Sequence, residues 1–342
     1  MKAIVLAVLP ALLAGCSDAL ERGTTAGQRI AIVNQTSGTL SLVAVADLTV
    51  EDVAMFPSGA APRTLAARGS LVAVPLGDTA KVVVLDFSAG TPVVDTFALS
   101  GPPRAGGADF QNDSILWVAL PTLNRVARVN VRSGDTTSVA VGNTPLGVVA
   151  ANGRIFVVNS NAPGGTPAGP SWVTAFICCG PARDSIPVTG SNAGPVVQGE
   201  DGFLYVIAAG RSGLAEGRLS IVDPASLSEV AVVNGLGESP GTAVYHPSSR
   251  LLIASAAEGV LEVNALTRAV VRGPGSGVRP GGTGVTAIAV DARGRVYATA
   301  AGSCVAAGPV HALSAPPDYD LRRSVTAGVC PAAAAVVFVP AL

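Results

Sequence analysis

Short apolar runs alternate with turn residues along almost the whole chain, and this pattern predicts a repeat built from four strands. One unit is the segment 195–233, in which VVQG, FLYVIAA, RLSIVD and EVAVV are separated by Glu-Asp-Gly, a Gly-rich loop and Pro-Ala-Ser-Leu-Ser. Short runs rich in Val, Ile, Leu and Tyr and bounded by Gly, Pro, Asp or Ser are typical of β-strands. The same order returns about every 40–50 residues, which indicates an array of small sheets.

Seven units can be aligned on their second strand. A turn pair such as Asn152-Gly153 or Asp201-Gly202 precedes most of these strands, as expected for a tight hairpin. Before that turn lies a strand of small residues, often opened by a proline, and small residues suit the crowded axis of a ring. The second strands are expected to begin at Arg29, Ser70, Ser114, Arg154, Phe203, Arg250 and Arg295.

The two ends of the chain predict how the ring closes. The chain enters the pattern on a second strand at Arg29 and leaves it on a first strand that ends near Pro340. Pairing the last strand with the first leaves no full-length sheet edge exposed. The sequence therefore predicts an all-β fold: a seven-bladed β-propeller of four-stranded antiparallel blades over residues 28–342, in which the C-terminal strand pairs with the N-terminal strands.

Composition agrees with one large domain and excludes a nucleic-acid partner. The chain has 342 residues, of which 49% are hydrophobic and 13% charged, so it can bury a large core. The formal net charge is −1, and a basic field of the kind that binds nucleic acid phosphates is therefore absent.

The N-terminus carries a pattern that indicates export. Lys2 precedes an apolar run from Ala3 to Ala14, which is too short to span a bilayer and suits a signal peptide. The run ends in Leu13-Ala14-Gly15-Cys16, which resembles the lipobox of bacterial lipoproteins. The resemblance implies that residues 1–15 are removed, that Cys16 is lipidated, and that residues 16–27 form a polar tether. An ordinary secretory signal that happens to contain a cysteine is the alternative.

The same resemblance implies a location in the cell. Ser17 follows the cysteine where Asp would mark retention in the inner membrane. The lipoprotein pattern therefore implies a protein of the bacterial cell envelope that is anchored by its N-terminal lipid. It favours the outer membrane, with the propeller facing the periplasm or the cell surface.

The repeats themselves resemble the seven-bladed YVTN/YncE-type propellers. The matching segments cover nearly all of the mature chain and include Pro145-Leu-Gly-Val-Val, Phe156-Val-Val-Asn-Ser, Leu204-Tyr-Val, Leu219-Ser-Ile-Val-Asp and Ala287-Ile-Ala-Val-Asp-Ala-Arg-Gly. These motifs are degenerate, and the resemblance implies a fold rather than a function.

Loop lengths predict which face of the ring carries a site. The connections between first and second strands, and between third and fourth strands, are expected to be short. Longer ones follow the second strands at 160–171, 209–217 and 301–309, and a long crossover to the next unit spans 272–284. Because strands alternate in direction, these long loops emerge on one face, where binding usually resides. Candidate binding residues at the channel mouth on that face are Arg63, Arg104, Asn159, Arg211, Glu238 and Arg279.

No catalytic constellation is expected. The segment 237–241 matches G-x-S-x-G, but that motif needs a strand-to-helix turn and a backbone N–H after the serine, whereas Ser239 precedes Pro240 and a strand. His311 belongs to a different unit, out of hydrogen-bond reach. The chain has only two histidines, and its acidic residues fall at strand ends and turns, so neither a metal site nor a cofactor is predicted.

Cysteines of an exported protein are expected to be oxidised. Cys304 and Cys330 should both emerge on the long-loop face of the last unit, which predicts a disulfide that fastens the closure of the ring. Cys178 and Cys179 end a third strand in a unit across the ring. A vicinal disulfide between these two residues is the first expectation, and two free thiols are the alternative.

Three functions remain open at this stage. The leading one is a non-enzymatic binding or scaffold module that presents the long-loop face to a protein or glycan partner. The second is a channel-mouth enzyme or small-ligand binder of the lactonase or quinoprotein propeller kind, which would need several carboxylates or amides converging on the channel. The third is a structural subunit of an envelope complex, which would expose a contiguous apolar loop face.

Overall fold

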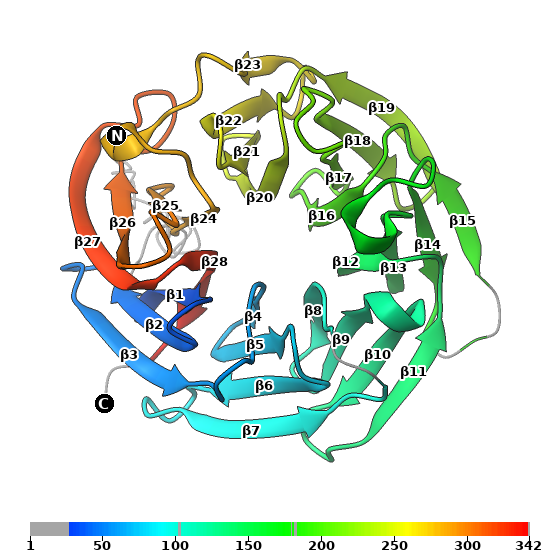
Figure 1. Cartoon of the computed structure of the whole chain (residues 1–342), viewed down its shortest axis with the longest axis horizontal. Helices are drawn as coiled ribbons and strands as arrows, with labels where there is room; N and C mark the ends of the chain where they lie inside the picture. Colours follow the sequence, from blue (N-terminus) through cyan, green and yellow to red (C-terminus); the bar gives the residue numbers. More distant parts are fainter. Residues whose placement is uncertain (1–26, 102–103, 179, 181–182, 341–342) are drawn as a thin grey trace, which may run out of the picture.

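The described residues form a ring of seven sheets around a central opening (Figure 1). The computed structural model describes residues 27–101, 104–178, 180 and 183–340. Each sheet has four antiparallel strands, which confirms the predicted seven-bladed β-propeller. The sheets are called blades 1 to 7 below, in order around the ring, and the first-named strand of each lies nearest the axis (Figure 1).

From the axis outward, blade 1 has β28 (Pro331–Phe338), β1 (Gln28–Asn34), β2 (Thr39–Ala44) and β3 (Val50–Met55). Blade 2 has β4 (Ala66–Arg68), β5 (Leu71–Leu76), β6 (Lys81–Asp86) and β7 (Val93–Ala98). Blade 3 has β8 (Ala108–Asn112), β9 (Ile115–Leu120), β10 (Arg125–Asn130) and β11 (Thr136–Ala140).

In the same order, blade 4 has β12 (Pro145–Ala151), β13 (Arg154–Asn159), β14 (Trp172–Phe176) and β15 (Asp184–Pro187), and blade 5 has β16 (Ala193–Gln198), β17 (Leu204–Ala208), β18 (Arg218–Asp223) and β19 (Ser228–Asn234). Blade 6 has β20 (Pro240–His246), β21 (Arg250–Ser255), β22 (Gly259–Asn264) and β23 (Val270–Arg272). Blade 7 has β24 (Ala287–Val290), β25 (Val296–Thr299), β26 (Ala307–Leu313) and β27 (Leu321–Val329).

The core lies between the blades rather than in the middle of the ring. Second strands such as β5 and β9 are buried along their whole length, since a blade packs against a neighbour on each face. Apolar side chains of each pair of adjacent blades form one cluster, and the seven clusters fill the seven interfaces. The outermost strands are mostly exposed, as β7 illustrates.

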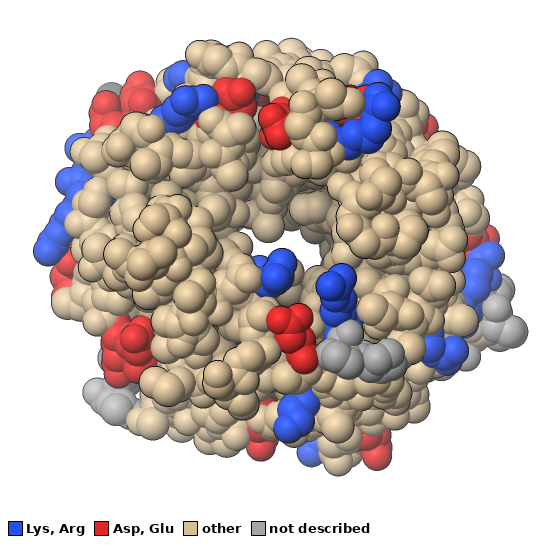
Figure 2. Space-filling view, in the orientation of Figure 1, with Lys and Arg blue, Asp and Glu red and all other residues tan. Residues whose placement is uncertain are grey.

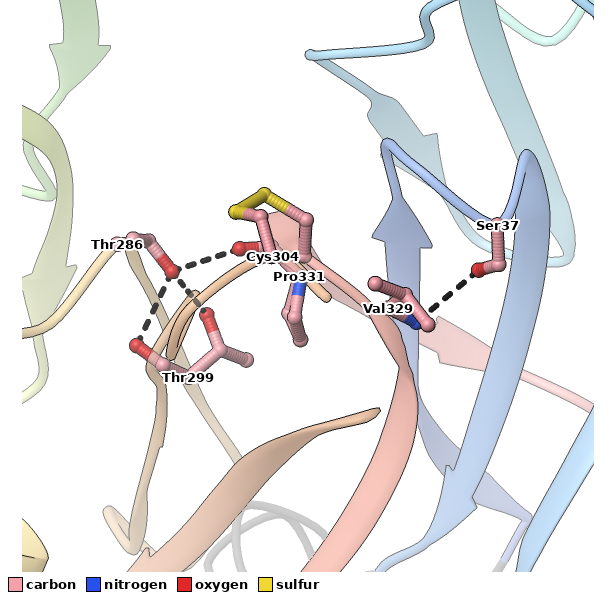
Figure 3. Close-up of a disulfide and its surroundings, with 7 residues drawn as sticks. Ser37, Thr286, Thr299, Cys304, Val329 and Pro331 are labelled. Carbon is pink, nitrogen blue, oxygen red and sulfur yellow. Dashed lines mark hydrogen bonds between the residues drawn. A yellow bond between two sulfur atoms is a disulfide. The ribbon is translucent and has the colours of Figure 1, made fainter. Parts of the chain in front are cut away.

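The ring closes as the sequence predicts. The C-terminal strand β28 pairs antiparallel with β1, with Ile30 opposite Val336 and Ile32 opposite Ala334. Figure 3 shows the seam beside this pairing, where Cys304 and Cys330 form a disulfide with their Cα atoms 4.4 Å apart. The predicted Cys304–Cys330 bridge is therefore confirmed.

Hydrogen bonds reinforce the seam on both sides (Figure 3). The hydroxyl of Thr286 lies 2.8 Å from the carbonyl oxygen of Pro331, to which it donates. On the other side, the backbone N–H of Val329 donates to the hydroxyl of Ser37 over 3.1 Å. The closing strand β28 is thus tied to blade 7, and the end of β27 in blade 7 is tied to the first hairpin of the chain.

Loop lengths agree with the expectation on one face and differ from it on the other. Residues 160–171 and 209–217 connect second to third strands as predicted, and β26 begins slightly earlier than expected. The expectation of short third-to-fourth turns throughout is wrong in blade 4, where β14 ends at Phe176 and β15 begins at Asp184, and in blade 7 at 314–320.

The segment 314–320 is long because it fills space between blades 6 and 7. It is closed by the backbone N–H of Ser314, which donates to the carbonyl oxygen of Asp320 over 2.9 Å. Tyr319 is buried within it and donates its hydroxyl hydrogen to Glu262 of β22.

Within the described residues, no helix has the length and hydropathy needed to cross a bilayer.

Candidate functional site

A cavity of about 580 Å³ occupies the central channel. Its wall is made by inner strands of the blades, which contribute small and apolar residues such as Ala108, Leu146, Val196 and Ile288. Its mouth is made by crossovers between blades and by second-to-third loops, including Thr144 and 162–165. The two loop types that the sequence places on one face therefore do meet at the channel.

Glycines let the inner strands approach closely enough to form this wall. A Cβ atom on Gly147 of β12 would lie 2.1 Å from the carbonyl oxygen of Gly194, and one on Gly107 would lie 2.6 Å from that of Leu146. Gly107 also donates its backbone N–H to the oxygen of Leu146 over 2.8 Å, which links blades 3 and 4 at the axis. The small residues that the sequence places in the first strands are therefore required for the inner strands to pack closely around the axis.

Two of the six predicted binding residues line the cavity. Arg63 precedes β4 in the crossover to blade 2, and Arg104 precedes β8 in the crossover to blade 3. Both side chains are exposed, and neither forms an ion pair with any described residue. Figure 2 shows basic and acidic side chains gathered on one side of the central opening.

Asp78 also lines the cavity, and sequence reasoning missed it. It follows β5, and its backbone N–H donates to the carbonyl oxygen of Ala60 over 3.1 Å. That bond holds the start of the β5–β6 connection against the crossover that carries Arg63. The available signal was the Gly77-Asp78 pair, because a polar turn directly after a second strand emerges on the same face as the long loops.

Asn159 does not lie at the channel mouth, which corrects its assignment there. Its side chain is fully buried at the end of β13. The amide accepts a hydrogen bond from the N–H of Gly142 and donates to Thr174 Oγ1, both over 2.9 Å. Asn34, at the same position of blade 1, is equally buried and donates to Ser41. An asparagine at the end of a second strand is therefore a structural residue in both blades.

The other three candidates lie in loops of the long-loop face but do not line the cavity. Arg211 pairs with Glu216 within the 209–217 loop, and this hydrogen-bonded pairing lowers the pKa of Glu216 to about 2. Glu238 accepts a hydrogen bond from the N–H of Gly213 over 3.1 Å. Arg279 donates to Glu258 over 3.1 Å.

Two of the long loops are held in shape by the same turn. Pro163–Gly165 and Pro280–Gly282 each form one 3₁₀ turn, and the next residue, a threonine in both, donates its N–H back to the proline carbonyl. In the 160–171 loop, Ser171 also donates its hydroxyl hydrogen to the carbonyl oxygen of Ser160 over 2.9 Å. These loops are ordered by their own hydrogen bonds.

The buried carboxylates of Glu262 and Asp291 are bonded to side chains of the blades and do not line the cavity. Glu262 is fully buried and bonded to Arg250 and to Tyr319. Asp291 is bonded to Arg295 over 2.7 Å and to the hydroxyl of Tyr297 over 3.1 Å. Both carboxylates are satisfied by arginine and tyrosine of their own or the adjacent blade.

No described group has the arrangement of a metal centre or a nucleophilic triad. Among residues 27–101, 104–178, 180 and 183–340, no three His, Cys, Asp or Glu side chains converge on one point. His246 bonds to Ser248 and to the carbonyl oxygen of Gly294, and His311 bonds to Ser324. Neither histidine is hydrogen-bonded to Ser239.

The remaining cysteines fall partly outside the described residues. Cys178 is disulfide-bonded, but Cys179 is not among the described residues, so the vicinal pairing stays a prediction. Cys16 and the rest of the expected signal peptide and tether also lie outside the described part of the chain.

Comparisons with known proteins identify the fold. No protein-family model and no curated protein matches the chain. A structure of hydrazine synthase from Kuenenia stuttgartiensis is similar with a TM-score of 0.65 and 15% identity, covering 82% of this chain and 90% of that one. A functionally unknown protein from Desulfotomaculum acetoxidans is similar with a TM-score of 0.68 and 15% identity, covering 92% and 99%. At this identity the likeness shows a shared propeller fold alone.

Proposed function

We propose that this propeller is a binding or scaffold module of the bacterial cell envelope, which presents its long-loop face to a protein or glycan partner. The observation that carries the proposal is the gathering of ordered loops around the mouth of the channel. Loops held by a rigid scaffold are where recognition usually resides. The 160–171 and 209–217 loops are cross-linked by their own hydrogen bonds, so little conformational freedom is lost when a partner binds.

The composition of the mouth favours binding over metal-assisted catalysis. A metal-dependent hydrolase of the propeller kind needs several carboxylates or amides directed at one point. The described lining of the cavity offers one carboxylate, Asp78, and one amide, Asn192, beside two arginines and many small residues.

The proposal includes a lipid anchor and a family. The pattern Leu13-Ala14-Gly15-Cys16 supports lipidation at Cys16, and the repeat motifs support a relationship with the YVTN/YncE-type propellers. In the proposed arrangement, residues 16–27 form the tether between the membrane and β1. The anchor would hold the protein at the outer membrane, facing the periplasm or the cell surface.

The partner proposal is tested by capture from envelopes of the source organism. The wild-type protein is compared with a variant from which residues 163–169 of the long loop are removed, and with an Ala225→Glu variant on the opposite face. We expect the loop variant to lose a partner that the wild type and the control retain. Partners that are unchanged in the loop variant would count against the long-loop face.

The anchor is tested separately by growth with radioactive palmitate. Label should be incorporated into the wild-type protein and be absent from a Cys16→Ala variant. Label that survives in the variant would show that Cys16 is not the lipidated residue.

A further inference from the structure

The central cavity has the size and lining of a small-molecule site. Ligand pockets have volumes of roughly 300–1,000 Å³ and combine apolar walls with a few placed polar groups. This cavity measures about 580 Å³, and its walls include Leu146, Val148, Val196 and Ile288. An apolar ligand body placed there would remove both its own surface and that of the wall from water.

The charged groups of the cavity are all on one side of the ring. Arg63 and Arg104 come from the crossovers into the adjacent blades 2 and 3, and Asp78 comes from blade 2. Their formal charges, two positive and one negative, sum to +1 on a protein whose formal net charge is −1. The channel is therefore more positive than the molecule as a whole.

The two arginines also differ from those in the surrounding loops. Arg211 and Arg279 of the same face are each paired with a glutamate. Arg63 and Arg104 have no acidic partner among the described residues. Arg104 further adopts a backbone φ of 139°, a region that favours glycine. Conformations of this kind are found where the surrounding structure holds a residue in place for a function.

We propose that the channel binds a small organic carboxylate with an apolar body. The guanidinium groups of Arg63 and Arg104 would take the carboxylate, since their N–H donors match its geometry and make charge-assisted hydrogen bonds. The apolar body would extend along the wall formed by Leu146, Val196 and Ile288. Asp78 leaves only one excess positive charge at the rim, which suits a monoanion better than a multiply charged one.

This site does not depend on the proposed macromolecular partner. It lies within the channel, whereas the partner is proposed to contact the loops around it. Loss of one activity in a variant therefore need not entail loss of the other, and the two proposals can fail separately.

Ligand-observed NMR with the purified full chain tests the proposal. The probes are 4-phenylbutyrate, which has one carboxylate and an apolar body, the neutral 4-phenylbutyramide, and inorganic phosphate. We expect 4-phenylbutyrate to bind at least about tenfold more tightly than the amide, because charge-assisted hydrogen bonds are among the stronger ones. Phosphate should bind more weakly than 4-phenylbutyrate, since it has no apolar body.

Variants assign the binding to the channel. Arg63→Gln combined with Arg104→Gln should weaken 4-phenylbutyrate binding at least about tenfold. Arg132→Gln, which alters an exposed arginine of a third-to-fourth turn on the opposite face, should leave it unchanged. Circular dichroism checks that all variants are folded. The proposal is overturned by absence of 4-phenylbutyrate binding at millimolar concentration, by equal affinity for the amide or for phosphate, or by binding that survives in the double arginine variant.

Discussion

Asp109 is a carboxyl group held between two inner strands of the ring. It belongs to β8, and its Oδ2 accepts a hydrogen bond of 2.8 Å from the backbone N–H of Ala150 in β12. Burial raises its pKa to about 6, although that hydrogen bond acts in the opposite direction. The neutral form is therefore favoured in the folded protein relative to the unfolded chain.

This shift predicts a pH dependence of stability. A carboxyl whose pKa is raised by folding stabilises the protein fully below its unfolded value, near 4, and this contribution is lost as the pH rises through about 6. Asp109→Asn keeps an oxygen that can accept from Ala150 and removes the titration. At pH 7 the variant should be more stable than the wild type by on the order of 2 kcal/mol.

Urea unfolding of both proteins across this pH range measures the effect. The difference in the free energy of unfolding should shrink as the pH falls from about 7 to about 4. A difference that does not change with pH would mean that Asp109 keeps an ordinary pKa in the folded protein.

At the same scale, sequence reasoning located the two channel arginines but did not distinguish them from Arg211 and Arg279, and it misplaced the buried amide of Asn159. Arg63 and Arg104 could be found because each follows a proline at an aligned position, and alignment places both at the start of an inner strand. Asn159 could not be placed in the same way. Successive side chains of a strand point to opposite faces of the sheet, so a shift of one residue changes the environment of the last side chain. The end of a strand predicted from sequence is uncertain by more than one residue.

Strands are the elements that the sequence predicts best. All seven second strands begin within one residue of the predicted position. Six of them follow a short turn with its own residue signature, and β1 is located by its apolar run. Small first strands were also predicted, and the close approach of Gly147 to Gly194 explains them. The 314–320 loop was not predicted, since its length depends on Tyr319 filling a gap between blades, which is a tertiary effect.

The disulfide is the element that fastens the ring closure. Cys304 lies in the loop between β25 and β26, and Cys330 lies between β27 and β28, 26 residues further along the chain. A cross-link over a loop of this size restricts the unfolded chain and is worth about 3 kcal/mol in the chain-entropy model. Replacing both cysteines by alanine should lower the free energy of unfolding by about this amount.

Urea unfolding without reductant checks this prediction, since the disulfide at Cys178 then stays intact in both proteins. The fold itself should be retained, because β28 remains paired with β1 through backbone hydrogen bonds. An unchanged midpoint and slope would show that the bridge adds no stability to the closure.

At the scale of the whole molecule, closure fixes which loops share a face. Because β28 supplies the inner strand of blade 1, every blade has the same four-strand order from the axis outward. Every crossover and every second-to-third loop then emerges on the face where the channel is lined by Arg63 and Arg104. The sequence predicts this strand order and the face on which the long loops emerge. The chemistry of the channel depends on the positions of individual side chains, which come from the structure.

Site-specific photo-crosslinking on the two faces of the ring is the most direct measurement of where this propeller binds. Ala168 in the 160–171 loop and Ala225 in the β18–β19 turn are both exposed alanines, on opposite faces, and each can be replaced by a photoreactive residue. Irradiation in the envelope of the source organism should give a discrete cross-linked product from position 168 and none from position 225. A product from position 225 alone, or none from either position, would contradict the assignment of the long-loop face as the binding face.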